Sequence, residues 1–259
     1  MKKIKFKRSI YEKIVFTLLI ISCSFSKNFD GAIAFIGQFP QGEFKNEGVP
    51  TGLGLDINGL WYPSEQVGLG LNLGISQYGN SERKIPFNYF TNLINITEKT
   101  TNDLAYGHLL LKLIPFQGNV RPYFEGLLGM KNLSTTTKLS NESCIDDSET
   151  DHDDCEIASS TNASDNAFSY GGGVGLEITL TSFGGDEDSD FEENENSGIE
   201  GLLSFYINAR YMIGDEAEYL KEGAISFSNP EDGPVSTSFD YSNSKTDVLQ
   251  ISLGLNFSF

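Results

Sequence analysis

The stretch LQISLGLNFSF, residues 249–259, alternates apolar residues with small or polar ones without a break. Side chains on successive residues of a β-strand point to opposite faces, so this stretch predicts a strand with one fully apolar face. An apolar face of this length suits the strands of ~9–11 residues that cross a membrane at a tilt. The C-terminal end of the sequence therefore predicts a membrane-spanning strand.

The same alternation recurs in other parts of the chain, always with one nearly apolar face. The segments are 30–38, 53–61, 67–76, 106–113, 121–131, 168–180 and 203–211. Together with 249–259 they predict an all-β protein, an eight-stranded antiparallel up-and-down transmembrane β-barrel. A run of ~18 apolar residues occurs nowhere after the N-terminal region, which excludes a helical membrane protein.

The connections between these segments differ in length. Three connections on one side of the barrel are expected at 63–66, 117–120 and 182–198. The first two are short, and the third is unusually long and acidic for a turn on that side. The connections on the other side are long and polar, at about 39–50, 80–101, 138–164 and 214–243. Short turns on one side and long loops on the other are typical of transmembrane barrels. With an even number of strands, both termini fall on the short-turn side, which predicts periplasmic termini and extracellular loops.

A soluble β-sandwich is the alternative fold, because it also alternates in polarity and has frequent turns. The opposite faces carry glycine, serine, asparagine and single charges, which fit inside a narrow barrel. A sandwich would place larger charged side chains in water there. The barrel is therefore the favoured interpretation.

The N-terminal region has the order of a secretory signal peptide. Cationic residues precede the apolar run 14–21, which is too short to span a bilayer, and small residues follow it. We expect a signal peptide at 1–26, cleaved after Ser26, and an outer-membrane β-barrel domain at 27–259. In the alternative, residues 20–23 resemble a lipobox, which would make Cys23 a lipidated N-terminus.

Charge excludes one class of function. The net charge is −18, and removal of residues 1–26, with six cationic side chains and Glu12, takes it to −23. A chain with this much negative charge is repelled by the phosphates of nucleic acids. We therefore expect no nucleic acid as a partner. Acidic loops can also hold divalent cations loosely.

Two cysteines, Cys144 and Cys155, lie in the same polar connection. A disulfide between them is the default interpretation for an exported protein. Closing so short a loop contributes roughly 3 kcal/mol in the chain-entropy model. Thiolate zinc binding is less favoured, because the spacing of a four-ligand site is missing.

The polar faces of the predicted strands would line the barrel interior. An eight-stranded barrel is just wide enough for side chains to fill it, and buried charges persist only when they are paired. We expect Lys112 to pair with Glu125 and Glu177 with Arg210, giving a static polar core or, in the alternative, a narrow ion pathway. The expected interior set is Asp56, His108, Lys112, Glu125, Lys131, Glu177 and Arg210.

Aromatic residues cluster where the short turns begin, which predicts a belt at the membrane surface on that side. The predicted belt comprises Trp61, Tyr62, Phe116, Phe257 and Phe259.

Catalytic chemistry has few candidates. His108 and His152 are the only histidines, and His152 sits in an acidic run typical of a solvated loop. The acidic segment 186–190 has the first spacings of a calcium loop, but Phe191 and Ser197 replace its glycine and glutamate. We expect no catalytic residues, no cofactor and no dedicated metal site.

The terminal residues 252–259 resemble the C-terminal signal of bacterial outer-membrane proteins that the barrel-assembly machinery reads. The matching positions are Ser252, Gly254, Phe257 and Phe259. The glycine-rich stretches RPYFEGLLG (121–129) and YGGGVGLE (170–177) resemble strands of the OmpA/OmpX-like outer-membrane β-barrel family, often called the porin family. This resemblance covers about residues 28–259, at the level of pattern.

The resemblance implies an outer-membrane barrel with structural, adhesive or minor pore roles and no catalytic apparatus. The chain departs from the family pattern in lacking a C-terminal peptidoglycan-binding domain, which leaves cell-wall tethering unsupported. Its long acidic connection at 182–198 is a second departure, which leaves the positions of the sixth and seventh strands open.

From these observations we expect a structural and surface-interaction role through long acidic extracellular loops, without catalysis. A narrow channel for ions or small solutes is one alternative, and a lipid-modifying barrel enzyme is another. The expected partners are outer-membrane lipid, the barrel-assembly machinery during biogenesis, and external ligands or cations at the loops. We expect a monomer.

Overall fold

The computed structural model describes residues 29–86, 95–141, 156–183, 201–228 and 236–259. The predicted signal peptide, the Cys144–Cys155 disulfide, His152 and the acidic segment 186–190 lie outside these residues. Predictions about them stay predictions.

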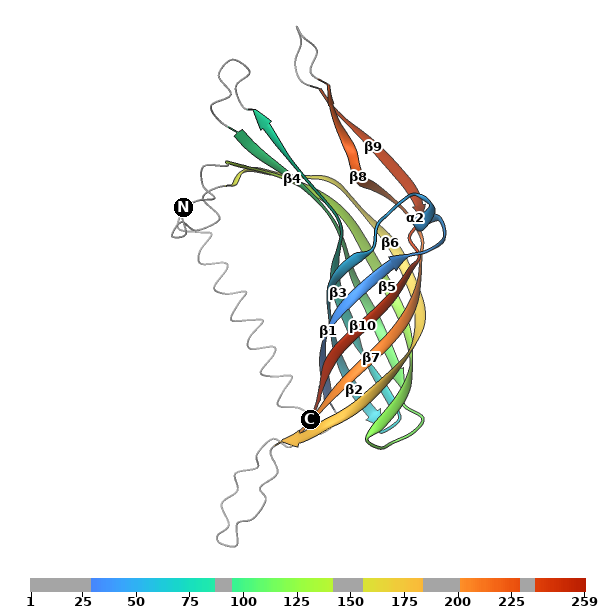
Figure 1. Cartoon of the computed structure of the whole chain (residues 1–259). Coiled ribbons are helices and arrows are strands. Elements are labelled where there is room, and N and C mark those ends of the chain that lie inside the picture. The colour runs from blue at the N-terminus through green and yellow to red at the C-terminus, as the bar shows by residue number, and fades with distance from the viewer. Residues whose placement is uncertain (1–28, 87–94, 142–155, 184–200, 229–235) are drawn as a thin grey trace, which may run out of the picture.

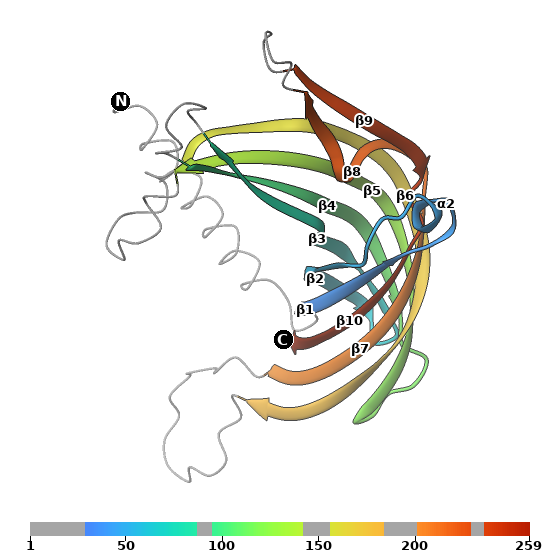
Figure 2. The same cartoon turned by 45° about the horizontal axis from the view of Figure 1, so that its top comes forward.

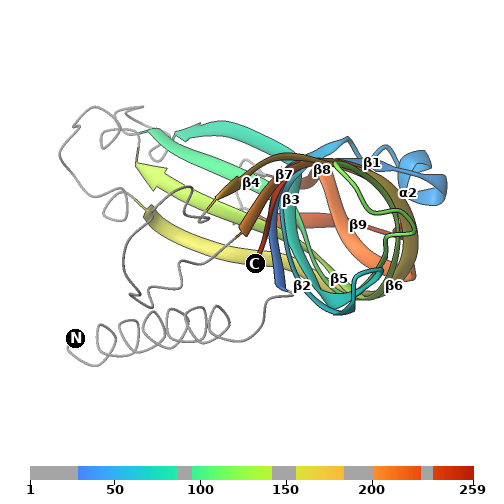
Figure 3. The same ribbon diagram turned by 90° about the horizontal axis from the view of Figure 1, so that it is seen from below.

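Eight strands close into a single antiparallel barrel, in the order β1-β10-β7-β6-β5-β4-β3-β2, which confirms the fold predicted from the sequence and implied by the family resemblance. Figure 3 shows the ring of strands from below. The strands are β1 (Phe29–Pro40), β2 (Gly52–Ser64), β3 (Val67–Pro86), β4 (Asn95–Leu113), β5 (Val120–Asn141), β6 (Glu156–Phe183), β7 (Gly201–Gly214) and β10 (Val248–Ser258).

The predicted C-terminal strand closes the barrel. β10 pairs with β1 from Asp30–Ser258 to Pro40–Val248, and its other edge pairs with β7. Phe29 and Phe259 exchange two backbone hydrogen bonds, of 3.2 and 2.9 Å. The ends of β1 and β10 therefore meet at the end of the barrel that carries the short turns, here called the short-turn end.

Glycines let aromatic rings lie flat against the inner wall. A Cβ added at Gly74 would overlap the ring of Tyr106, and one at Gly175 would overlap the ring of Tyr123. Each ring lies over the adjacent strand, where only the absence of a side chain leaves room. The glycine-rich strands are thus part of how this narrow interior is filled.

The outer face of the barrel is apolar. Large side chains stand exposed on it, with Phe35 at 76% and Leu53 at 72%. A soluble sandwich would bury such a face, whereas hydrocarbon is a suitable solvent for it. Trp61, Phe116 and Phe259 are exposed at its short-turn end.

The aromatic belt prediction is wrong for Tyr62, which is buried inside the barrel. Tyr62 follows Trp61 directly, so the alternation of a strand turns its side chain to the opposite face.

The apolar outer face gives way to polar residues at a recognisable level on β3, β5 and β6. Ile75 is followed by Gln77 on β3, Met130 by Asn132 on β5, and Phe168 is preceded by Asn166 on β6. Beyond this level β3, β4, β5 and β6 continue as a curved sheet, here called the protruding sheet (Figure 1).

The prediction of four long loops is wrong for most of their residues. Much of 80–101 and 138–164 belongs to the protruding sheet, and 214–243 contains most of a hairpin, β8 (Glu216–Ser228) with β9 (Ser236–Lys245). A short helix, α2 (Gly42–Asn46), lies in the first predicted loop. Among the described residues no helix is long and apolar enough to cross a membrane. Figure 2 shows the hairpin over one end of the barrel, here called the hairpin end.

Candidate functional site

The barrel interior holds most of the buried charge among the described residues, and it is the candidate site that the sequence singles out. All seven predicted interior residues lie inside the barrel, none more than 8% exposed: Asp56, His108, Lys112, Glu125, Lys131, Glu177 and Arg210. Strand alternation places them there, since each lies on the face opposite the apolar outer one.

Near the short-turn end, Glu177 on β6 binds two cations. Its Oε2 accepts a hydrogen bond of 2.8 Å from Lys112 Nζ, and its Oε1 accepts one from Arg121. Asn256 donates to the same Oε1 at 3.1 Å, and the ammonium of Lys112 lies 4.3 Å from the centre of the Tyr123 ring. We call Glu177, Lys112, Arg121 and Asn256 the basal group.

Farther inside, Arg210 on β7 binds two carboxylates. Its Nε and Nη2 donate to Glu125 at 2.6 and 3.2 Å, and its Nη1 donates to Asp56 Oδ2 at 3.3 Å. Asp56 Oδ2 also accepts hydrogen bonds from the Tyr106 hydroxyl and from Asn72. We call Arg210, Glu125 and Asp56 the central group. The planar guanidinium of Arg210 binds the Glu125 carboxylate through two N–H donors, which the single ammonium of a lysine could not do in the same geometry.

The predicted pairing of these charges is wrong. Lys112 and Glu125 are directly opposite in the β4–β5 register, yet Lys112 binds Glu177 and Glu125 binds Arg210. The barrel is narrow enough for long side chains to reach across its interior, so adjacency along a strand pair does not decide the partner. Lys131 donates to a backbone oxygen, that of Thr246, at 2.8 Å.

His108 is buried next to Tyr106, with ring centroids 5.2 Å apart. Within the described part of the chain, neither of its ring nitrogens has a hydrogen-bond partner. A general base needs a group that orients its ring and access to its substrate. The geometry around His108 supplies neither, so it does not support the lipid-modifying hypothesis. Nor do the described residues include a group of three or more His, Cys, Asp or Glu side chains suited to a metal ion.

Most of the large buried side chains at the hairpin end are apolar. Phe44 of α2 packs edge-on against Tyr219 of β8, with ring centroids 5.1 Å apart, and against Tyr78 of β3 at 6.1 Å. These rings belong to one buried cluster, here called the apolar plug, which comprises Ile36, Phe44, Val49, Tyr78, Leu104, Tyr106, Leu133, Ala167, Met212, Ala217, Tyr219 and Val248. The plug fills the end of the barrel beneath the hairpin.

Sequence reasoning missed the plug because its key side chains lie in segments predicted to be loops. Phe44 is the buried residue of α2, and nothing in its sequence neighbourhood indicates that it turns inward. Ala217 and Tyr219 carried a usable signal, since they are apolar at alternate positions next to charged ones.

One small cavity lies between the charged groups of the interior. This cavity, bordered by Asn58, Lys112, Glu125 and Asn256, has about 10 Å³ for the centre of a water molecule. That is room for about one water. At these levels the described side chains of the basal group, the central group and the apolar plug occupy the barrel interior.

No family model matches the chain, and no curated protein sequence matches it. Among solved structures, the chain is similar to Neisserial surface protein A (NspA), with 10% identity, a TM-score of 0.38, and coverage of 90% of this chain and 98% of that one. It is also similar to Ail, the attachment invasion locus protein of Yersinia pestis, with 15% identity, a TM-score of 0.33 and coverage of 90% and 100%.

A third similar structure is a major outer membrane protein from Thermus thermophilus, with 12% identity, a TM-score of 0.32 and coverage of 89% and 99%. These values are too low to transfer an activity from any of the three proteins.

Proposed function

We propose that the chain is a monomeric outer-membrane barrel that serves as a closed scaffold, and that it contacts external partners through its hairpin end. One observation carries this proposal: the interior is filled by the basal group, the central group and the apolar plug, while four strands continue beyond the apolar outer face. Binding function concentrates on segments that a rigid scaffold holds in place.

Location in the outer membrane is supported by the apolar outer face and by the predicted signal peptide and C-terminal assembly signal. The short-turn end would face the periplasm, as transmembrane barrels generally place their short turns. The protruding sheet and the hairpin would then lie outside the cell.

A surface-contact assay with a hairpin variant tests this proposal. Replacing Lys221–Asp240 with a short Asn-Gly turn should leave the barrel closed, because the variant keeps Ala217 and Tyr219 of the apolar plug and joins the opposite residues Leu220 and Tyr241. Cells that display the intact chain should bind to immobilised extracellular-matrix proteins or to other cells, and cells that display the variant should not.

The control is a check that both chains reach the surface in equal amounts as folded barrels. Equal binding by the two displayed chains, or no binding by the intact one, would contradict the proposed surface role.

A further inference from the structure

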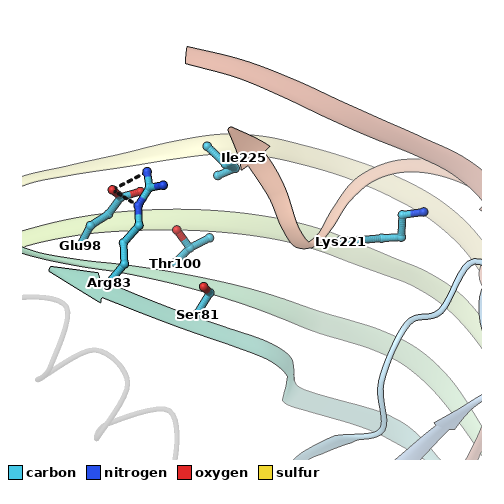
Figure 4. A pocket seen from close by; sticks show the side chains of 6 residues that line it. All are labelled: Ser81, Arg83, Glu98, Thr100, Lys221 and Ile225. Atoms are coloured by element: carbon cyan, nitrogen blue, oxygen red, sulfur yellow. Dashed lines mark hydrogen bonds and ion pairs between the residues drawn. The ribbon is translucent and has the colours of Figure 1, made fainter. Parts of the chain in front are cut away.

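A cleft lies between the hairpin and the inner face of the protruding sheet, outside the barrel interior. Figure 4 shows the six side chains that line it: Ser81, Arg83, Glu98, Thr100, Lys221 and Ile225. It offers about 40 Å³ for the centres of water molecules. At about one water per 10–15 Å³, that is room for three or four waters, or for the hydroxyls on one edge of a small ligand.

One wall of the cleft lies on the protruding sheet, where Ser81 and Thr100 begin a row of hydroxyl and amide groups. Ser81 on β3 lies opposite Thr100 on β4, which lies opposite Thr137 on β5. The hydroxyls of Thr100 and Thr137 are 3.0 Å apart, and Asn162 on β6 donates to Thr137 Oγ1 at 2.6 Å. The groups of Thr100, Thr137 and Asn162 are thus connected, and the hydroxyls in this row can both donate and accept hydrogen bonds.

The next row along the same wall is an ion pair. Arg83 Nε and Nη2 both lie close to Glu98 Oε2, at 2.9 and 2.8 Å. Arg83 is 42% exposed, whereas Glu98 is 4% exposed, so the buried carboxylate depends on the arginine for its charge balance. The pair adds polar groups to the cleft without adding net charge.

The facing wall, on the hairpin, has an apolar residue with aromatic side chains nearby. Ile225 on β8 lines the cleft, and Phe239 lies opposite it on β9. Directly opposite residues of an antiparallel pair share one face, so Phe239 stands on the same face of the hairpin as Ile225, next to the residues that line the cleft. Its ring centroid lies 6.0 Å from that of Tyr241, whose hydroxyl donates to the backbone oxygen of Asn162 at 3.2 Å.

The hairpin is tied to the end of α2 and to β6. Lys221 Nζ binds Glu47 Oε2 at 3.0 Å, and the backbone N–H of Glu218 donates to Asp165 at 2.9 Å. Between Leu220 and Ile225 the register of β8 and β9 shifts, in the part of β8 that supplies the cleft-lining residues Lys221 and Ile225.

We infer that this cleft binds the edge of a neutral sugar ring at the end of a glycan, an inference that rests on the proposed surface role and names its ligand class. A sugar ring carries hydroxyls that both donate and accept, which suit the polar wall, and a C–H face that packs on aromatic rings. The charges that line the cleft are largely balanced by Glu98 and Glu47, which disfavours a phosphate or sulfate group.

Saturation-transfer NMR on the refolded full chain, in a detergent without a sugar headgroup, tests the inference. The probes are D-galactose, D-glucose and N-acetyl-D-glucosamine, with N-acetylneuraminic acid and inorganic phosphate as anionic probes. We expect transfer to at least one neutral sugar. Thr100→Val, which keeps the shape and removes one hydroxyl, should weaken that binding about fivefold.

Thr101→Val is the matched control, because Thr101 is the next residue on β4 and points to the opposite face of the sheet. It should leave sugar binding unchanged, while Phe239→Ala should weaken it. Ser81→Ala provides a second test on the polar wall if Thr100→Val does not fold.

Absence of transfer to all three neutral sugars would overturn the inference, as would equal effects of Thr100→Val and Thr101→Val. Binding of phosphate or N-acetylneuraminic acid alone would instead identify an anion site and overturn it as well. If the hairpin variant loses surface contact but no sugar binds, the ligand class is wrong while the proposed function stands.

Discussion

The two ends of the barrel interior are filled in different ways. Toward the short-turn end, Glu177 and Arg210 each organise a group of buried charges, with an apolar cluster around Tyr62 beside them. The hairpin end is filled mainly by the apolar plug around Phe44, where Lys131 is the buried cation. A buried charge requires each of its partners, but an apolar cluster requires only shape and volume. The charged groups should therefore be the part of the interior that is most sensitive to single substitutions.

Removal of Arg210 should have the largest effect. Arg210→Met leaves Glu125 and Asp56 buried without their cation, and breaking a buried pair in this way costs about 3–5 kcal/mol. Urea unfolding from lipid vesicles, followed by the fluorescence of Trp61, measures the change in the free energy of unfolding.

A rescue variant separates lost charge balance from lost packing. Combining Arg210→Met with Glu125→Gln and Asp56→Asn removes the unpaired charges and should restore more than half of the lost stability. If Arg210→Met costs less than about 1 kcal/mol, the charged groups are not what holds this part of the interior together.

The plug should respond to volume. Phe44→Ala should cost about 3 kcal/mol, because Phe44 is fully buried between the rings of Tyr78 and Tyr219. Phe44→Leu keeps an apolar side chain of similar volume and should cost less than about 1.5 kcal/mol. Equal losses in the two variants, measured by the same unfolding experiment, would show that volume is not the determining property.

Adding a methyl group at a glycine of the inner wall should have an effect of intermediate size on the free energy of unfolding. Gly74→Ala forces a methyl group into the ring of Tyr106 and should cost about 2 kcal/mol. Gly126 is the control, because an added Cβ there would meet nothing within 4 Å. Gly126→Ala should therefore change the free energy of unfolding by less than about 0.5 kcal/mol, and a loss as large as that of Gly74→Ala would refute the packing explanation.

The smallest effect is expected outside the barrel, at the ion pair of Lys221 and Glu47. Both side chains are partly exposed, so Lys221→Met should cost less than about 1 kcal/mol at neutral pH. The hydrogen bond from Lys221 to Glu47 raises the pKa of Lys221. The contribution of this ion pair to the free energy of unfolding is therefore present below the unfolded-state pKa of Lys221, about 10.4. It is lost as the pH rises through the higher folded-state pKa.

Unfolding of the wild type and Lys221→Met at neutral pH and at about pH 12 checks this titration. The small difference at neutral pH should shrink at the alkaline value. A difference that grows with pH would have the wrong sign for this ion pair.

The barrel could be predicted from the sequence because membrane strands separate apolar and polar residues strictly. A period of two in segments such as 249–259 is sufficient to assign inside and outside, and it placed Arg210 and Glu177 correctly on the inner face. Which charges pair could not be predicted, since that depends on how far each side chain reaches across the interior.

The protruding sheet and the hairpin could not be predicted from the sequence, for a different reason. In water both faces of a strand can be polar, so threonine-rich stretches such as 134–138 have no alternation that distinguishes a strand from a loop. Their pairing comes from continuing the register of the barrel strands, which is a long-range property. The cleft beside the hairpin therefore had no signal in the sequence.

Single-channel recording in planar bilayers tests most directly whether the barrel is a closed scaffold. The refolded full chain in concentrated potassium chloride should give no stepwise current, because the basal group, the central group and the apolar plug fill the interior. Stepwise currents whose size changes on substitution of Arg210 or Phe44 would contradict the account, since they would place a conducting path through those groups.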